Sequence, residues 1–95
     1  MNNIKESIFS VNDNALIKEI DGEAVIVSSM DAMITSINQT GTFIVNLVKE
    51  KPSSYQDILM AVTENFDIKT KEADDDLFEF LNQLIQCNLI NHKNV

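Results

Sequence analysis

The chain is poor in the residues that form disulfides, signal sequences and membrane spans. It has no tryptophan, one histidine and a single cysteine, Cys87, so no disulfide can form within it and nothing indicates an oxidising compartment. Residues 1–14 contain one lysine and no apolar run of signal-peptide length. No stretch approaches the ~18 consecutive apolar residues of a transmembrane helix. These absences predict a cytoplasmic protein without a membrane partner.

Basic residues are also scarce. Seven Lys and Arg stand against fifteen Asp and Glu, which gives a net charge of −8 at pH 7. Nucleic acids and anionic membranes are bound through clustered Lys and Arg, so the charge argues against both as partners. The length of 95 residues predicts one domain, and a chain this short buries only ~60–65% of its unfolded surface. That is enough for one core and too little for a deep, enclosed active site.

Glycine and proline are rare enough to mark the boundaries of elements. Asp21-Gly22 separates two β-prone runs, residues 16–20 and 23–28, which is the signature of a two-residue hairpin. A third run, residues 32–37, follows a short connection, and short connections favour antiparallel neighbours. The pattern predicts a three-stranded antiparallel meander, preceded by an irregular arm over residues 8–12.

Three stretches with helical spacing of apolar residues follow Asn38. The predicted helices, with their N-caps, are 41–50 after Thr40, 54–66 with a capping box of Ser53 and Gln56, and 71–87 after Thr70. Residues 92–95 are expected to fray. The predicted fold class is α+β, winged helix-turn-helix-like, with a three-stranded antiparallel sheet followed by three helices.

The sequence offers no convincing catalytic, cofactor or metal site. Cys87 and His92 form a weak nucleophile–base candidate, because His92 lies near a loose chain end. Asp74, Asp75 and Asp76 are consecutive helical positions that point about 100° apart, so they do not converge on one ion. Two isolated glycines cannot build a phosphate-binding loop. We therefore predict a non-enzymatic protein without a cofactor.

The third predicted strand carries the most informative feature. A meander leaves its third strand at an edge, and proteins usually protect edges with Lys, Pro or bulges. Residues 32–37 contain neither Lys nor Pro. An open edge of this kind accepts an extended peptide as an added strand. The alternative, that a helix or the N-terminal arm covers this edge, is equally compatible with the residues.

Three segments resemble the PqqD-like family. They are Glu19-Ile20-Asp21-Gly22-Glu23-Ala24-Val25, Ile37-Asn38-Gln39-Thr40-Gly41-Thr42-Phe43-Ile44, and Asp76-Leu77-Phe78-Glu79-Phe80-Leu81-Asn82-Gln83-Leu84 followed by Leu89-Ile90. The resemblance covers about residues 10–91 of one domain spanning 1–95. The chain departs from the family pattern at Asn88, where glycine is frequent, and at residues 43–45, where a tryptophan is common.

The resemblance implies a winged helix-turn-helix domain that recognises precursor peptides in ribosomally synthesised and post-translationally modified peptide pathways. In such proteins the leader peptide adds as a strand to the third strand and lies against the third helix. The domain acts as a peptide chaperone that delivers the precursor to a modifying enzyme. That partner is a radical SAM enzyme in pyrroloquinoline quinone assembly, a leader protease in lasso-peptide pathways, or a cyclase.

The resemblance and the open edge together predict one peptide-binding surface. The backbones of residues 32–36 would pair with the leader, and side chains of the third helix would line its other side. The predicted site residues are Met30, Ala32, Met33, Ile34, Thr35, Ser36, Asp75, Asp76, Phe78, Glu79, Asn82 and Gln83. Core packing is a competing explanation for Phe78 and Ile34, and a solvated helix face competes for the three acidic residues.

Two other functions compete with peptide binding. A winged-helix transcriptional regulator requires Lys or Arg on its recognition helix, but residues 53–95 contain three Lys against eight acidic residues. A small structural subunit or a homodimer would use the same open edge for self-association. A salt-sensitive shift of DNA mobility favours the first, and light scattering with and without peptide separates the second.

Overall fold

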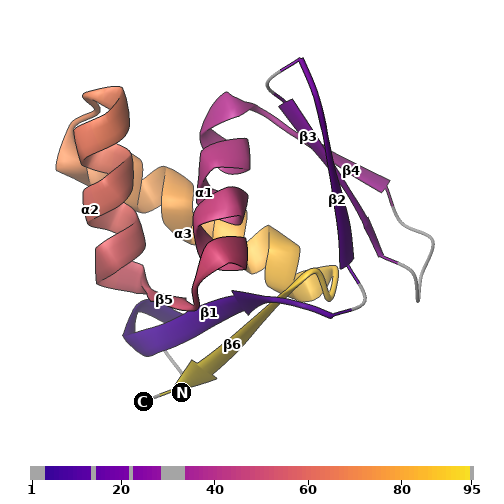
Figure 1. The fold of residues 1–95 in the computed structure, drawn as a ribbon. Helices are drawn as coiled ribbons and strands as arrows, with labels where there is room; N and C mark the ends of the chain where they lie inside the picture. Colours follow the sequence, from indigo (N-terminus) through magenta and orange to yellow (C-terminus); the bar gives the residue numbers. More distant parts are fainter. Residues whose placement is uncertain (1–3, 14, 22, 29–33, 95) are drawn as a thin grey trace.

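The computed structural model describes residues 4–13, 15–21, 23–28 and 34–94. It contains two three-stranded sheets and three α-helices. The elements in chain order are η1 (Ile4–Glu6), β1 (Ser7–Val11), β2 (Ala15–Ile20), β3 (Glu23–Ser28), β4 (Ile34–Ile37), α1 (Gln39–Glu50), β5 (Ser53–Ser54), α2 (Tyr55–Phe66), α3 (Thr70–Gln86) and β6 (Ile90–Asn94). Figure 1 shows α1 between the sheet of β2, β3 and β4 and helix α2, with β1, β5 and β6 at one end of the molecule.

The predicted antiparallel meander is confirmed as the sheet β2-β3-β4. Strands β2 and β3 pair from Ala15↔Ser28 to Ile20↔Glu23, so two residues connect them. Asp21 has φ of 54°, as the first position of such a turn requires, and Gly22 lies outside the described residues. Strand β4 then pairs antiparallel with β3.

The second sheet, in the order β5-β1-β6, was not predicted. The expected irregular arm over residues 8–12 is largely strand β1. Residues 92–94 of the segment expected to fray belong to strand β6, which pairs with β1 from Ser7↔Asn94 to Val11↔Ile90; Val95 lies outside the described residues. Both predictions were wrong because each segment is stabilised by the other. Phe9 is fully buried, with its ring centroid 6.4 Å from that of Tyr55 and 6.5 Å from that of His92.

The three predicted helices are present, but their N-caps were wrong. Asn38, not Thr40, caps α1, and its Oδ1 accepts a hydrogen bond from the Gly41 N–H. Ser54 caps α2, because Ser53 belongs to β5. Helix α3 begins at Thr70 itself, after Lys69, which provides no side-chain cap. For α1 and α2 the observed cap is fixed by a hydrogen bond from a backbone N–H, of Gly41 and Asp57 respectively, which spacing alone does not report.

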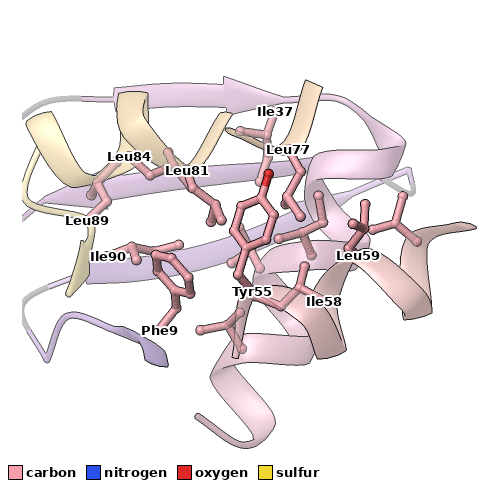
Figure 2. Packing of buried hydrophobic residues seen from close by; sticks show 14 of the residues in the cluster. Phe9, Ile37, Tyr55, Ile58, Leu59, Leu77, Leu81, Leu84, Leu89 and Ile90 are labelled. Carbon is pink, nitrogen blue, oxygen red and sulfur yellow. The ribbon is translucent and has the colours of Figure 1, made fainter. Parts of the chain in front are cut away.

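One hydrophobic core joins the helices to both sheets. Helix α3 contributes Leu77, Leu81 and Leu84, which point into the same cluster as Phe9 and Tyr55 (Figure 2). The sheet β2-β3-β4 contributes buried residues from one face, including Ala24, Ile26 and Ile37. Complete burial of a large apolar side chain stabilises a fold by about 1.5–3 kcal/mol, so α3 is held firmly beside the end of β4.

Candidate functional site

Strand β4 is a terminal strand of its sheet. The sheet order is β2-β3-β4, and no described segment pairs with β4 on the side away from β3. The N-terminal arm does not cover this edge, because β1 pairs with β5 and β6 instead. Within the part of the chain that the structure describes, the ladder of β4 is available to an added strand.

The register shows which backbone groups of β4 face outward. The two residues that flank a two-residue hairpin turn form a hydrogen-bonded pair. The backbone N–H and C=O of Glu23 therefore point toward β2, and those of Ala24 point away from β2. The Ala24 N–H indeed donates to the Thr42 hydroxyl on α1, which lies away from β2. Because backbone groups alternate in direction along a strand, those of Ile26 also point away from β2. They face the backbone groups of its partner Thr35 on β4.

The outward positions are therefore Ile34 and Ser36. Each presents one backbone N–H and one C=O on the side of β4 that has no described neighbour. An extended peptide that pairs with these two residues would complete a fourth strand of the sheet.

The junction Asn38–Thr42 fixes the end of β4 against α1 and β3. The Thr42 hydroxyl donates to the Asn38 carbonyl oxygen and accepts from the Ala24 N–H, both at 2.8 Å. The Asn38 side chain accepts from the Gly41 N–H, also at 2.8 Å. Three hydrogen bonds thus lock the strand-to-helix turn, which explains why Asn, Gly and Thr occur here in this order.

Gly41 also lets helix α3 approach this junction closely. A β-carbon at Gly41 would lie 3.0 Å from two ring atoms of Phe80 and 3.3 Å from the Asn38 Oδ1. Only glycine leaves this space open without displacing the ring. The Phe80 ring therefore sits directly beside the N-terminus of α1.

Two hollows lie between this junction and α3, and they share Asn38, Phe80 and Gln83. The first, which we call the neutral hollow, has a volume of about 390 Å³. It is lined by Ile37, Asn38, Phe80, Gln83, Leu84, Gln86 and Cys87. The second, which we call the acidic hollow, has a volume of about 340 Å³. It is lined by Asn38, Thr40, Gly41, Ile44, Val62, Ile68, Ala73, Asp76, Leu77, Glu79, Phe80 and Gln83.

The predicted site residues fall into four groups. Met30, Ala32 and Met33 lie outside the described residues. Ile34, Thr35 and Ser36 form β4, of which the structure describes the backbone pairing. Asp76, Glu79 and Gln83 line the hollows beside the end of β4. Asp75, Phe78 and Asn82 line neither hollow.

The other flank of α3 is occupied by a polar cluster from distant parts of the chain. The Lys5 ammonium lies 5.5 Å from the Phe78 ring centroid and 3.0 Å from an Asp74 carboxylate oxygen. The Tyr55 hydroxyl lies 2.6 Å from the other Asp74 carboxylate oxygen. The Asn82 amide donates to the Phe78 carbonyl oxygen at 3.1 Å. This flank holds η1 and α2 against α3.

Two pKa values reflect this cluster. Burial raises the pKa of Tyr55 well above its usual value of 10.0, and the hydrogen bond to Asp74 adds to the shift. The Tyr55 hydroxyl and the Lys5 ammonium hold the pKa of the Asp74 carboxyl below its usual value of 3.8. Both shifts favour the protonation states that make the hydrogen bond at neutral pH.

Sequence reasoning missed Phe80, Asn38 and Cys87 as residues of the site. The apolar band of α3 is wider than one core contact requires, and Phe80 is the member of it that lines both hollows. Cys87 and His92 do not act together: Cys87 lines the neutral hollow, whereas the His92 ring lies against Phe9 and Ser7. Among the described residues, no three His, Cys, Asp or Glu side chains group to hold a metal ion, and no helix is long and apolar enough to cross a bilayer.

Known proteins share the sequence pattern and the fold of this chain. The family model of coenzyme PQQ synthesis protein D (PqqD) matches residues 23–90, which include β3, β4, the junction and all of α3. The chain belongs to the PqqD family. No curated protein matches the sequence of this PqqD-family protein.

Two solved structures are similar to this PqqD-family protein in fold. One is TbiB1 in complex with the TbiA(β) leader peptide, with a TM-score of 0.79 and 21% identity, covering 86% of this chain and 94% of that one. The other is lasso peptide synthetase B1 complexed with the leader peptide, with a TM-score of 0.75 and 16% identity, covering 87% of this chain and 96% of that one. At these identities the likeness concerns the fold.

Proposed function

We propose that this PqqD-family protein is a non-catalytic binder of the leader region of a ribosomal precursor peptide. The observation that carries the proposal is the outer edge of β4 beside the two hollows of α3, with no described segment on that edge. Membership of the PqqD family supports it. So does the similarity in fold to two proteins whose structures contain a leader peptide.

The binding mechanism requires no covalent step. The leader adopts an extended conformation and exchanges backbone hydrogen bonds with Ile34 and Ser36, which supplies affinity for any sequence. Side chains of an added strand alternate between two faces, so every second one points toward α3. There Phe80, Gln83 and the walls of the hollows discriminate between leaders. Met30, Ala32 and Met33 would extend the contact along the chain before β4.

The flank of α3 that we assign to the leader agrees only in part with the sequence-based prediction. Asp76, Glu79, Phe80 and Gln83 line the hollows, and we assign the contact to them. Phe78 and Asn82 belong to the flank that packs against η1, so we assign them a structural role.

The bound leader would be presented to a modifying enzyme of the same pathway, such as a radical SAM enzyme, a leader protease or a cyclase. In this arrangement the domain holds the leader and leaves the remainder of the precursor accessible to the enzyme. Holding the substrate next to the catalyst raises its effective concentration without any new chemistry in this chain.

The described residues of α3 do not favour the transcriptional regulator. The solvent-exposed positions of α3 include Glu72, Asp75, Asp76 and Glu79, and carboxylates on a recognition helix repel DNA phosphates. The same surface suits a peptide ligand.

Amide NMR with the precursor encoded beside the gene tests the proposal. Unlabelled leader peptide should shift the amides of residues 34–38 and 76–87 of the labelled protein. Ser36→Pro removes an outward N–H and should abolish binding while the fold persists. Ser36→Ala keeps that N–H and is the matched control. If the leader binds Ser36→Pro as tightly as the wild type, or shifts amides only elsewhere, strand addition to β4 is wrong.

A further inference from the structure

The acidic hollow combines an apolar floor with a negatively charged rim. Ile44, Val62 and Leu77 are at most 3% exposed and form part of its wall. Asp76 and Glu79 line the same hollow and are exposed to solvent. Residues three apart on a helix have β-carbons about 5–6 Å from each other, so one cation can reach both carboxylates.

Nothing in the described structure neutralises these two carboxylates. The residues that line the acidic hollow include no lysine or arginine. Across residues 4–13, 15–21, 23–28 and 34–94, neither Asp76 nor Glu79 takes part in an ion pair or a side-chain hydrogen bond. By contrast, Asp74 on the opposite flank is already paired with Lys5.

The neutral hollow differs in chemistry although the two share a wall. Its lining contains no carboxylate and no lysine, and Ile37, Leu84 and Phe80 provide apolar contact. A peptide that passes from one hollow to the other therefore meets an apolar environment and then a negatively charged one. Only a side chain with a long apolar stem and a cationic end matches the acidic hollow completely, and that description fits Lys and Arg.

We infer that the leader carries a Lys or Arg whose aliphatic stem lies in the acidic hollow and whose charged end pairs with Asp76 and Glu79. An apolar side chain on the same face of the added strand, about two or four residues away, lies in the neutral hollow. This inference rests on the proposed function and names the class of leader that the site selects. The net charge of −8 adds long-range attraction for a basic peptide.

A library of random extended peptides, selected on the immobilised full chain, provides the test. Peptides whose binding is lost on Ser36→Pro are sequenced, because these are the ones that pair with β4. We expect Lys or Arg to be enriched at one position, with an apolar residue enriched nearby. The selected basic peptides should bind Asp76→Asn/Glu79→Gln about threefold to twentyfold more weakly than the wild type.

The matched control is Glu64→Gln/Glu72→Gln, which removes the same charge from exposed helical positions that line neither hollow. It should leave the affinity within twofold of the wild type. Asp76→Lys/Glu79→Lys should instead select peptides with Asp or Glu at the same position. Thermal unfolding of each variant shows that its fold persists.

The outcomes separate this inference from the proposed function. Peptides that depend on β4 but show no enrichment of Lys or Arg overturn the inference and leave strand addition intact. Equal losses in the hollow variant and its control also overturn the inference, because they indicate an effect of net charge alone. If no peptide depends on β4, both proposals are wrong.

Discussion

The ring of Phe80 lies 3.0 Å from the point where a β-carbon would stand on Gly41. This contact joins α3 to the N-terminus of α1 and sets the width of the space beside β4. Because Phe80 lines both hollows, and Gly41 itself lines the acidic hollow, the glycine helps to set the shape of the site.

Gly41→Ala should destabilise the protein by about 1 kcal/mol. Overpacking typically costs 1–3 kcal/mol, while alanine in a helix regains up to about 1 kcal/mol relative to glycine. Urea denaturation measures the difference. Phe80→Leu removes the ring edge, so Gly41→Ala in that background should be neutral or stabilising. An equal loss in both backgrounds contradicts the close contact.

Thr42→Val should destabilise the protein by about 1–3 kcal/mol, because the buried Ala24 N–H loses its acceptor. Valine has nearly the same shape, so packing changes little. Thr42→Ser keeps the hydroxyl and should retain more of the stability. The free energy of unfolding in urea provides the measurement. In the leader complex, the amide signals at the end of β4 should broaden in Thr42→Val and stay sharp in Thr42→Ser.

Tyr55→Phe should remove a contribution to stability that the wild type loses at alkaline pH. The pKa of Tyr55 is higher in the folded chain than its unfolded value of 10.0, chiefly because of burial. Its contribution is therefore complete below pH 10 and is lost as the pH rises above it. Melting temperatures between pH 8 and 11 should fall more steeply for the wild type than for Tyr55→Phe. Parallel curves would contradict the raised pKa.

Leader binding should slow the alkylation of Cys87 severalfold. This thiol is half-buried in the lining of the neutral hollow, and it is the single cysteine of the chain. Reaction with iodoacetamide, followed by mass spectrometry, measures the rate of alkylation with and without the leader peptide. Ser36→Pro should abolish the protection at the same peptide concentration. Protection that persists in this variant would place the peptide away from β4.

Local sequence features were sufficient for much of the fold. Asp21-Gly22 predicted a hairpin that the register Ile20↔Glu23 confirms. The apolar spacing after Asn38 predicted three helices close to their observed bounds. The spacing of apolar residues predicts these segments correctly because the burial pattern of each segment depends on residues only a few positions apart.

The same reasoning was wrong where a segment depends on a distant partner. The sequence of strand β6 is typical of a polar tail, and its structure depends on pairing with β1, from Ser7↔Asn94 to Val11↔Ile90, at the other end of the chain. On α3, Phe78 and Phe80 are two residues apart and equally apolar. Their different roles follow from what lies opposite: Lys5 faces Phe78, and Gly41 faces Phe80.

The amino-acid sequence alone determined the class of the protein: its charge, its hairpin and helices, and the segments that resemble the PqqD family. The tertiary structure decided which strand edge has no partner among the described residues and which flank of α3 lines the hollows. The physical reason is that backbone pairing and side-chain contact across the chain depend on the positions of segments far apart in sequence. Spacing within one segment reports only which face of that segment is apolar.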